Sequence, residues 1–199
     1  MTPPLRVVKV GGSLLRHQPE AQAKDISATL LKWIAQQPPA INVLMAGGGE
    51  FADIIRRADA THNLGEETAH WLCVDALSIT ARLLAVIVNA AVVTEEKELP
   101  SLAASICVFN PGPFLREIEP RIFATPLPHT WAVTSDSIAA RLAEHLTASE
   151  LVLLKSILPV EARGYVDDYF LVAAARLSHI RYVNLRSSDF EEIIWDSRP

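Results

Sequence analysis

Short runs of apolar, often β-branched residues alternate along the chain with segments in which apolar residues recur every three or four positions. Continuous apolar runs are typical of strands buried on both faces of a sheet, and the three-to-four spacing is typical of helices that cover it. The alternation predicts an α/β fold: a three-layer α/β/α sandwich with a largely parallel sheet. Strands are expected at Leu5 to Val10, Ile41 to Ala46, Ser105 to Phe109, Glu150 to Lys155 and Ile180 to Leu185.

Helical spacing recurs in several segments. The first begins near Ile26 and ends before Pro38, because a proline ring and its missing N–H prevent a helix from continuing. The second runs from about Glu66 to Ala90, and its apolar stripe must be covered by the sheet or by another copy of the chain, so we expect a homo-oligomer, such as a dimer. A third follows from Ile138 to Leu146, and Ser188 to Trp195 predicts a short terminal helix.

The segment from Pro111 to Pro128 contains five prolines and little periodicity. This composition predicts an irregular connection, which is long for a compact domain. Two interpretations stay open: a loop that covers a substrate, or a simple crossing of the surface.

Length and composition favour one globular domain over residues 1–199, with 50% hydrophobic and 21% charged residues. The net charge of -5 lacks the basic footprint of a nucleic-acid partner, so any bound anion should be small. The N-terminus has no basic region followed by a long apolar stretch, and Leu83 to Val93 is shorter than the ~18 residues of a membrane span. We expect a cytoplasmic protein with no membrane partner.

Two glycine clusters follow the first two predicted strands. Gly11 and Gly12 come directly after Leu5 to Val10, and Gly47 to Gly49 come after Ile41 to Ala46. Glycine allows positive φ angles and lets backbone N–H groups approach an anion, and Lys9 adds a mobile positive charge for phosphoryl oxygens. Two such units predict a phosphate-handling site, although one cluster alone would be typical of an ordinary turn.

Two further polar groups stand at the ends of predicted elements. Thr134, Ser135, Asp136 and Ser137 precede the helix that begins near Ile138; they are either an N-cap or a set in which Asp136 orients a lysine or a substrate amine. Lys155 ends a buried-looking strand at the sheet edge where α/β folds hold ligands. Together Lys9, Lys155 and Asp136 could bracket a transferring phosphoryl group, which needs positioning and charge neutralisation rather than a protein nucleophile.

Other kinds of site have little support. The six histidines show no ligand spacing, so no metal site built from protein ligands is expected, and they are assigned to solvent-facing or core-edge positions. Cys73 and Cys107 are interpreted as buried thiols in a reducing compartment. No dinucleotide or P-loop glycine motif occurs. Arg56 and Arg57 either reach an anionic substrate or form a solvated helix face.

Three segments resemble the amino acid kinase family: VVKVGGSLL at residues 7–15, VLMAGGGEFAD at 43–53 and TSDSIAARLA at 134–143. Their order matches, and they span about two thirds of the chain. The combination of WAVTSDSIAARLA with LVLLKS is similar to the compact branch of this family that phosphorylates an aminomethylfuran methyl phosphate in methanofuran biosynthesis.

The resemblance implies an ATP- and Mg²⁺-dependent kinase of a small metabolite. It would place Lys9 on the transferring phosphoryl group, with Asp136 fixing the active-site lysines, Lys155 among them. The residues implied for the nucleotide phosphates are Gly11, Gly12, Ser13 and Ser156. Those implied for the acceptor are Gly47, Gly48, Gly49, Thr134 and Ser135.

One segment departs from the family pattern. Many members carry an acidic, glycine-containing turn after the late strand, where this chain has Ile157 to Glu161. Gly164 to Phe170 could supply substitute contacts for adenine and ribose, or Asp167 and Asp168 could cap the helix that follows. Two alternative functions therefore stay open: an acyl-phosphate-forming kinase of the glutamate, acetylglutamate or aspartate type, and a non-catalytic descendant that binds a small anion.

Overall fold

A seven-stranded sheet organises the computed structural model, which describes residues 3–16, 26–101, 105–158 and 165–195. The strand order is β3-β4-β2-β1-β5-β6-β7, and every neighbouring pair is parallel except β6 with β7. The strands are β1 (Leu5–Val10), β2 (Ile41–Ala46), β3 (Ala91–Val93), β4 (Ile106–Phe109), β5 (Glu150–Lys155), β6 (Ile180–Asn184) and β7 (Glu192–Trp195).

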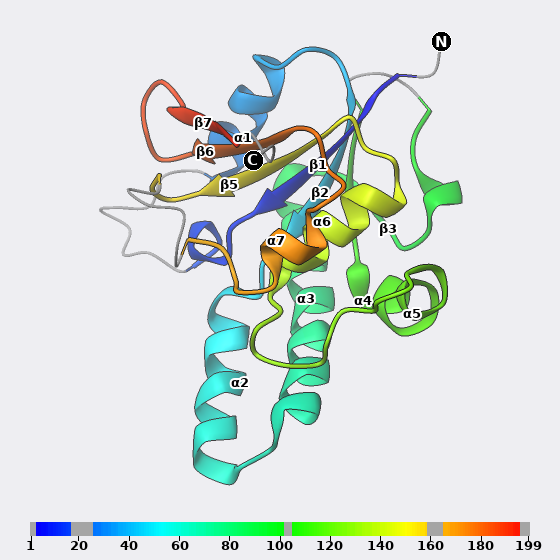
Figure 1. The fold of residues 1–199 in the computed structure, drawn as a ribbon. Helices are drawn as coiled ribbons and strands as arrows, with labels where there is room; N and C mark the ends of the chain where they lie inside the picture. The colour runs from blue at the N-terminus through cyan, green and yellow to red at the C-terminus, as the bar shows by residue number, and fades with distance from the viewer. Residues whose placement is uncertain (1–2, 17–25, 102–104, 159–164, 196–199) are drawn as a thin grey trace.

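The two faces of the sheet bury alternate residues of the same strands in two separate cores. On β1, Val7 packs in one core and Val8 in the other, and on β5 Leu153 and Leu154 divide in the same way. Helices lie on both faces (Figure 1), so the predicted α/β architecture with a largely parallel sheet is confirmed. Because side chains alternate between two buried faces, the central strands are mostly apolar, and the charged exceptions on β1 are Arg6 and Lys9.

The helices differ in what they cover. α1 (Ile26–Ala35) packs Trp33 against one core, and α6 (Ser135–His145) packs Leu142 against the other. α2 and α3 form an antiparallel pair that extends beyond the sheet, at the bottom of Figure 1. The remaining helices are α2 (Gly49–His62), α3 (Glu66–Val88), α4 (Pro111–Pro113), α5 (Glu119–Ile122) and α7 (Phe170–Ala173), with single turns η1 (Gly12–Leu14), η3 (Glu96–Glu98) and η4 (Phe114–Ile118).

The predicted terminal helix at Ser188 to Trp195 is wrong. Residues 192–195 form β7, which pairs antiparallel with β6, and the rings of Tyr182 and Trp195 lie 5.9 Å apart. Phe190 is buried and has a φ of 54°, which turns the chain back toward the sheet. A segment of eight residues is too short for a helix to be stable by itself, and pairing with the free edge of β6 satisfies its backbone instead.

The segment from Pro111 to Pro128 is only partly irregular, which corrects the prediction. Helical turns run from Pro111 to Ile122 through α4, η4 and α5. Asn110 caps the first of them, because its side chain accepts a hydrogen bond from the N–H of Gly112 at 3.1 Å. Prolines occupy the first turns of α4 and α5, where a missing N–H has no cost, so proline content alone did not exclude helix.

α3 is long and apolar enough to cross a membrane by length and composition, but much of it lies in the core. Its buried residues include Val74, Leu77, Ala81 and Leu84. Four apolar side chains on another face are exposed: Leu72, Ile79, Leu83 and Val86.

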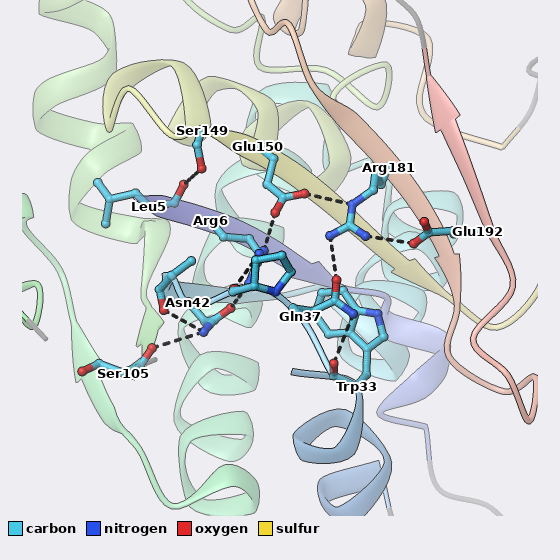
Figure 2. Close-up of polar contacts among 12 residues, drawn as sticks. Leu5, Arg6, Trp33, Gln37, Asn42, Ser105, Ser149, Glu150, Arg181 and Glu192 are labelled. Carbon is cyan, nitrogen blue, oxygen red and sulfur yellow. Dashed lines mark hydrogen bonds and ion pairs between the residues drawn. The ribbon is translucent and has the colours of Figure 1, made fainter. Parts of the chain in front are cut away.

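The amino ends of the central strands carry a buried polar network, shown in Figure 2. Glu150 accepts from Arg6 at 2.5 Å and from Arg181 at 2.9 Å. Arg6 also donates to Asn42 at 3.0 Å and to the carbonyl of Pro38 at 3.1 Å. One carboxylate therefore joins β1, β5 and β6, while Arg6 extends the connection to β2 and to the loop before it.

Candidate active site

The carboxyl ends of β1 and β5 bring two lysines to one carboxylate. Lys9 lies on β1, Lys155 ends β5, and Asp136 lies in the first turn of α6. The Nζ atom of Lys9 is 2.8 Å from Oδ1 of Asp136, and the Nζ atom of Lys155 is 2.6 Å from Oδ2. Lys155 also donates to the backbone oxygen of Tyr165 at 3.0 Å. The aspartate thus fixes two ammonium groups side by side.

Burial makes this cluster electrostatically strong. Lys9 is 5% exposed and Asp136 is 4% exposed. Burial acts to raise the pKa of Asp136, but Lys9 and Lys155 outweigh it and hold that pKa below its ordinary value. Burial and the charge of Lys9 lower the pKa of Lys155, against the opposing pull of Asp136. Within this trio, two cations and one anion leave one positive charge at a largely buried position, which suits a phosphoryl group.

The two glycine clusters pack directly against each other. The N–H of Gly11 donates to Leu154 O at 2.8 Å, and the N–H of Gly47 donates to Val10 O at 2.9 Å, so both loops are tied to strand ends. A Cβ on Gly47 would lie 2.7 Å from the nitrogen of Gly12, and one on Gly12 would collide with the backbone of Gly49. Within these clusters only Gly49 has a positive φ, of 54°. Close backbone approach is therefore the main reason for glycine here.

The start of α6 is held by a residue that sequence reasoning placed elsewhere. Asp167 accepts from the N–H and the hydroxyl of Thr134 at 2.9 and 2.7 Å, and from the N–H of Ser137 at 3.0 Å. The hydroxyl of Ser137 donates to the same carboxylate. Asp167 thus caps α6 rather than the helix that follows it, and holds the turn that carries Asp136. No local signal could reveal this pairing, because the partners are 30 or more residues apart.

Ser13 and Ser156 also meet. Their hydroxyl oxygens lie 3.2 Å apart, which joins the loop after β1 to the loop after β5. The segment that departs from the family pattern is described only for Ile157 and Leu158. The rest of it, from Pro159 to Glu161, lies outside the described residues, as do Gly164 and His17.

A cavity opens between α2, α3 and the start of α6, next to the glycine loops. Arg56 lies over the ring of Trp131, with 4.8 Å between its guanidinium carbon and the ring centroid, and Trp131 donates to Asp59 at 2.8 Å. The cavity walls are mostly apolar: the lining residues are Gly48, Ala52, Arg56, His70, Cys73, Val74, Leu77, Thr130, Trp131, Val133, Thr134, Ser135 and Ile138.

The cavity corrects two predictions. His70 was expected at the surface or the edge of the core, but it is buried on the cavity wall. Cys73 was expected to be buried and is half-buried at the same cavity, whereas Cys107 is buried as expected. Arg57 does not line the cavity, so of the arginine pair only Arg56 reaches it.

Comparisons with known proteins place the chain in a family. Residues 4–187 match the amino acid kinase family. A [5-(aminomethyl)furan-3-yl]methyl phosphate kinase from Methanocaldococcus jannaschii is 26% identical over 164 residues, which cover 77% of this chain and 66% of that protein.

Solved structures share the fold. The UMP kinase of Ureaplasma parvum superposes with a TM-score of 0.63 at 13% identity, covering 98% of this chain and 100% of that one. The uridylate kinase of Archaeoglobus fulgidus gives a TM-score of 0.54 at 18% identity, with coverages of 89% and 79%. The UMP kinase of Bacillus anthracis gives 0.60 at 12% identity, with coverages of 94% and 90%.

Proposed function

We propose a function from one premise: this chain belongs to the amino acid kinase family. It is a kinase, and the family implies that it uses ATP. We infer that its acceptor is [5-(aminomethyl)furan-3-yl]methyl phosphate or a close analogue, on which the Methanocaldococcus jannaschii relative acts. The product would then be a diphosphate, in a pathway of the methanofuran type. The observation that carries the proposal is the buried Asp136 between Lys9 and Lys155, at the strand ends that the glycine loops follow.

In this proposal the lysine cluster stabilises the transferring γ-phosphoryl group. Lys9 and Lys155 neutralise the charge on its oxygens. Asp136 keeps both ammonium groups in place and forms no covalent bond to the phosphoryl group. An oxygen of the acceptor phosphate attacks phosphorus as the bond to ADP breaks, so the protein needs no nucleophile of its own. Positioning and charge are then the whole of the protein's contribution.

The loops would divide the two substrates between them. The backbone of Gly11 and Gly12, together with Ser13 and Ser156, would lie against the nucleotide phosphates; the N–H of Gly11 already donates to Leu154 O, so its part would be close backbone approach. The acceptor would lie on the other side, in the cavity. Its proposed contacts are Gly47, Gly48, Gly49, Thr134 and Ser135.

Mg²⁺ is part of the proposal as an ion carried largely by the nucleotide. Among the residues that the structure describes, no three His, Cys, Asp or Glu side chains gather as a metal cage. This fits Mg²⁺ in kinases, which keeps several waters and binds substrate phosphates with few protein ligands. When bound, the ion would add positive charge beside the phosphates, next to the charge supplied by Lys9 and Lys155.

The decisive experiment measures ADP release with defined acceptors. We expect turnover with ATP, Mg²⁺ and [5-(aminomethyl)furan-3-yl]methyl phosphate, and none with N-acetylglutamate or glutamate. An acyl phosphate formed from a carboxylate would be trapped by hydroxylamine, whereas a diphosphate would not, so one assay separates the two kinds of kinase. Calorimetry with ATP and Mg²⁺ tests the third possibility, since a non-catalytic descendant would bind no nucleotide at millimolar concentration.

Replacement of Lys9 tests the proposed role of the cluster. Lys9→Ala should lower kcat by about 10²-fold or more, because it removes one charge partner of the transition state, while the fold persists. Lys97→Ala is the matched control, since that side chain is 76% exposed on η3. Unchanged turnover in Lys9→Ala would refute the assignment.

We also propose that the protein is a cytoplasmic homo-oligomer that uses the exposed apolar face of α3. Leu72, Ile79, Leu83 and Val86 are spaced so that they share one side of the helix, and Val86 is 81% exposed. Sedimentation of Leu83→Glu and Val86→Glu variants tests this surface. We expect a shift to monomer, and an unshifted oligomer would exclude this face.

A further inference from the structure

His70 is a buried polar side chain in the cavity that the lysine cluster does not use. It lies in the first turns of α3 and is 6% exposed. Its ring stacks on His129, with centroids 5.0 Å apart, and meets the edge of Trp71 at 5.2 Å. Within the part of the chain that the structure describes, its imidazole forms no hydrogen bond. Its ring nitrogens are not among the fully buried, unpartnered side-chain atoms of the described residues, so they are open to the cavity that His70 lines, where a ligand can bond to them.

The spacing of residues along α3 places His70 away from the glycine loops. Gly48, Thr134 and Ser135 form the end beside the glycine loops. α3 then carries the wall outward from Leu77 to His70, seven residues that correspond to roughly 10 Å of helix. An acceptor whose phosphate lies at the loop end would therefore present its far substituent to His70.

The chemical properties of the cavity around His70 indicate which kind of substituent can bind there. Burial lowers the pKa of His70 to about 4, with help from His129 and Arg116 and against the charge of Glu67, so the ring is neutral at physiological pH. A neutral imidazole offers one lone pair and one N–H. The arginines nearby already have partners: Arg116 pairs with Asp75 at 2.6 Å, and Arg56 lies on Trp131 near Asp53.

We propose that His70 binds the acceptor by accepting a hydrogen bond from an amino group at the end of the substrate opposite its phosphate, and so determines acceptor specificity. The inference rests on the proposed function, because it takes the acceptor to be a phosphorylated ring compound that bears an aminomethyl arm. The apolar walls formed by Val74, Leu77, Val133 and Ile138 hold the ring between the two polar ends.

The kinetic test compares two acceptors: [5-(aminomethyl)furan-3-yl]methyl phosphate and its counterpart with a methyl group in place of the aminomethyl arm. The unmodified enzyme should prefer the amine in kcat/KM by roughly 10- to 100-fold, as expected for one buried hydrogen bond to a charged group. His70→Phe, which keeps a ring and loses both nitrogens, should abolish the preference through the KM of the amine, with the KM of ATP unchanged. His179→Phe is the control, since His179 is exposed.

A binding test that needs no turnover uses Cys73 as a reporter. This thiol is half-buried at the same cavity, and the second cysteine, Cys107, is buried in the sheet. An acceptor in the cavity should slow the alkylation of Cys73 by iodoacetamide, read by mass spectrometry. The amine should protect at a concentration at least 10-fold lower than the methyl compound, and His70→Phe should remove this difference. His70→Leu, which also has no hydrogen-bond acceptor, serves if the phenylalanine variant fails to fold.

The outcomes separate the inference from the proposed function. Amine-dependent protection without turnover would support His70 and refute the proposed reaction. Turnover with an amine preference that survives in His70→Phe would support the reaction and overturn the role of His70. If neither acceptor protects Cys73 in the unmodified protein and neither is phosphorylated, both proposals fail.

Discussion

Three residues concentrate most of the chemistry that the chain can offer. Asp136 contacts Lys9 at 2.8 Å and Lys155 at 2.6 Å, and all three lie largely out of water. Burial of either lysine without a partner would cost free energy, and the negative charge of Asp136 offsets this cost for both ammonium groups. The same carboxylate therefore serves stability and geometry, so its replacement should affect both.

Replacement of Asp136 by Asn should lower the free energy of unfolding by about 3 kcal/mol, because two buried ammonium groups lose their counter-charge. Chemical denaturation measures this loss, and the same variant should show no ADP release above background. Lys9→Met provides the comparison: it leaves Asp136 paired with Lys155, so its stability loss should be smaller. Equal losses in the two variants would contradict this account.

At the scale of elements, the first turn of α6 determines where Asp136 points. Thr134 is the N-cap residue, but the carboxylate of Asp167 receives the free backbone N–H groups of Thr134 and Ser137 as well as both hydroxyls. Negative charge at a helix N-terminus is favourable in itself. Asp167 is thus a positioning residue, which acts on the active site through the helix that it caps.

Asp167→Ala should therefore destabilise the protein by about 1 to 2 kcal/mol, the range for loss of a strong N-cap. We also expect a lower kcat with little change in the KM of ATP, because Asp136 would move while the glycine loops stay in place. Asp168→Ala is the matched control, since the neighbouring side chain is exposed. Thermal unfolding and steady-state kinetics of the Asp167→Ala and Asp168→Ala variants test this prediction. If the two variants have the same stability and the same kcat, the cap has no functional role.

For the whole molecule, the parallel sheet separates stability from chemistry. Lys9 and Lys155 stand at the carboxyl ends of β1 and β5, whereas the network of Arg6, Glu150 and Arg181 stands at the amino ends (Figure 2). Strands run the full depth of the domain between the two. A change in the network should therefore alter folding without altering turnover.

Glu150→Ala should lower the free energy of unfolding by about 3 kcal/mol, because Arg6, 3% exposed, would lose its counter-charge inside the protein. Glu192→Ala removes the other carboxylate that pairs with Arg181, but its side chain is 42% exposed, so the cost should stay below about 1 kcal/mol. Urea denaturation measures both, and kcat should match the unmodified enzyme in both variants. A large fall in kcat with Glu150→Ala would show that the two ends of the sheet are coupled.

The sequence by itself determined the layers and most strands. β1, β2 and β5 have the predicted bounds because each is a short, mostly apolar run, as a strand buried on both faces requires. The glycine clusters, Lys9, Lys155 and the polar group around Asp136 were visible for a similar reason: each stands at the end of an element, where local sequence reports on local backbone.

Tertiary structure alone decided which residues meet. The capping of α6 by Asp167, the burial of His70 against His129 and the pairing of β7 with β6 all join segments that no local spacing connects. The terminal segment shows this most clearly, because its sequence allowed a helix and the free edge of β6 offered backbone partners that made it a strand. Short-range propensities amount to tenths of a kcal/mol per residue, whereas pairing at a sheet edge or compensation of a buried charge contributes several kcal/mol. Long-range contacts therefore prevail where they disagree with local propensity.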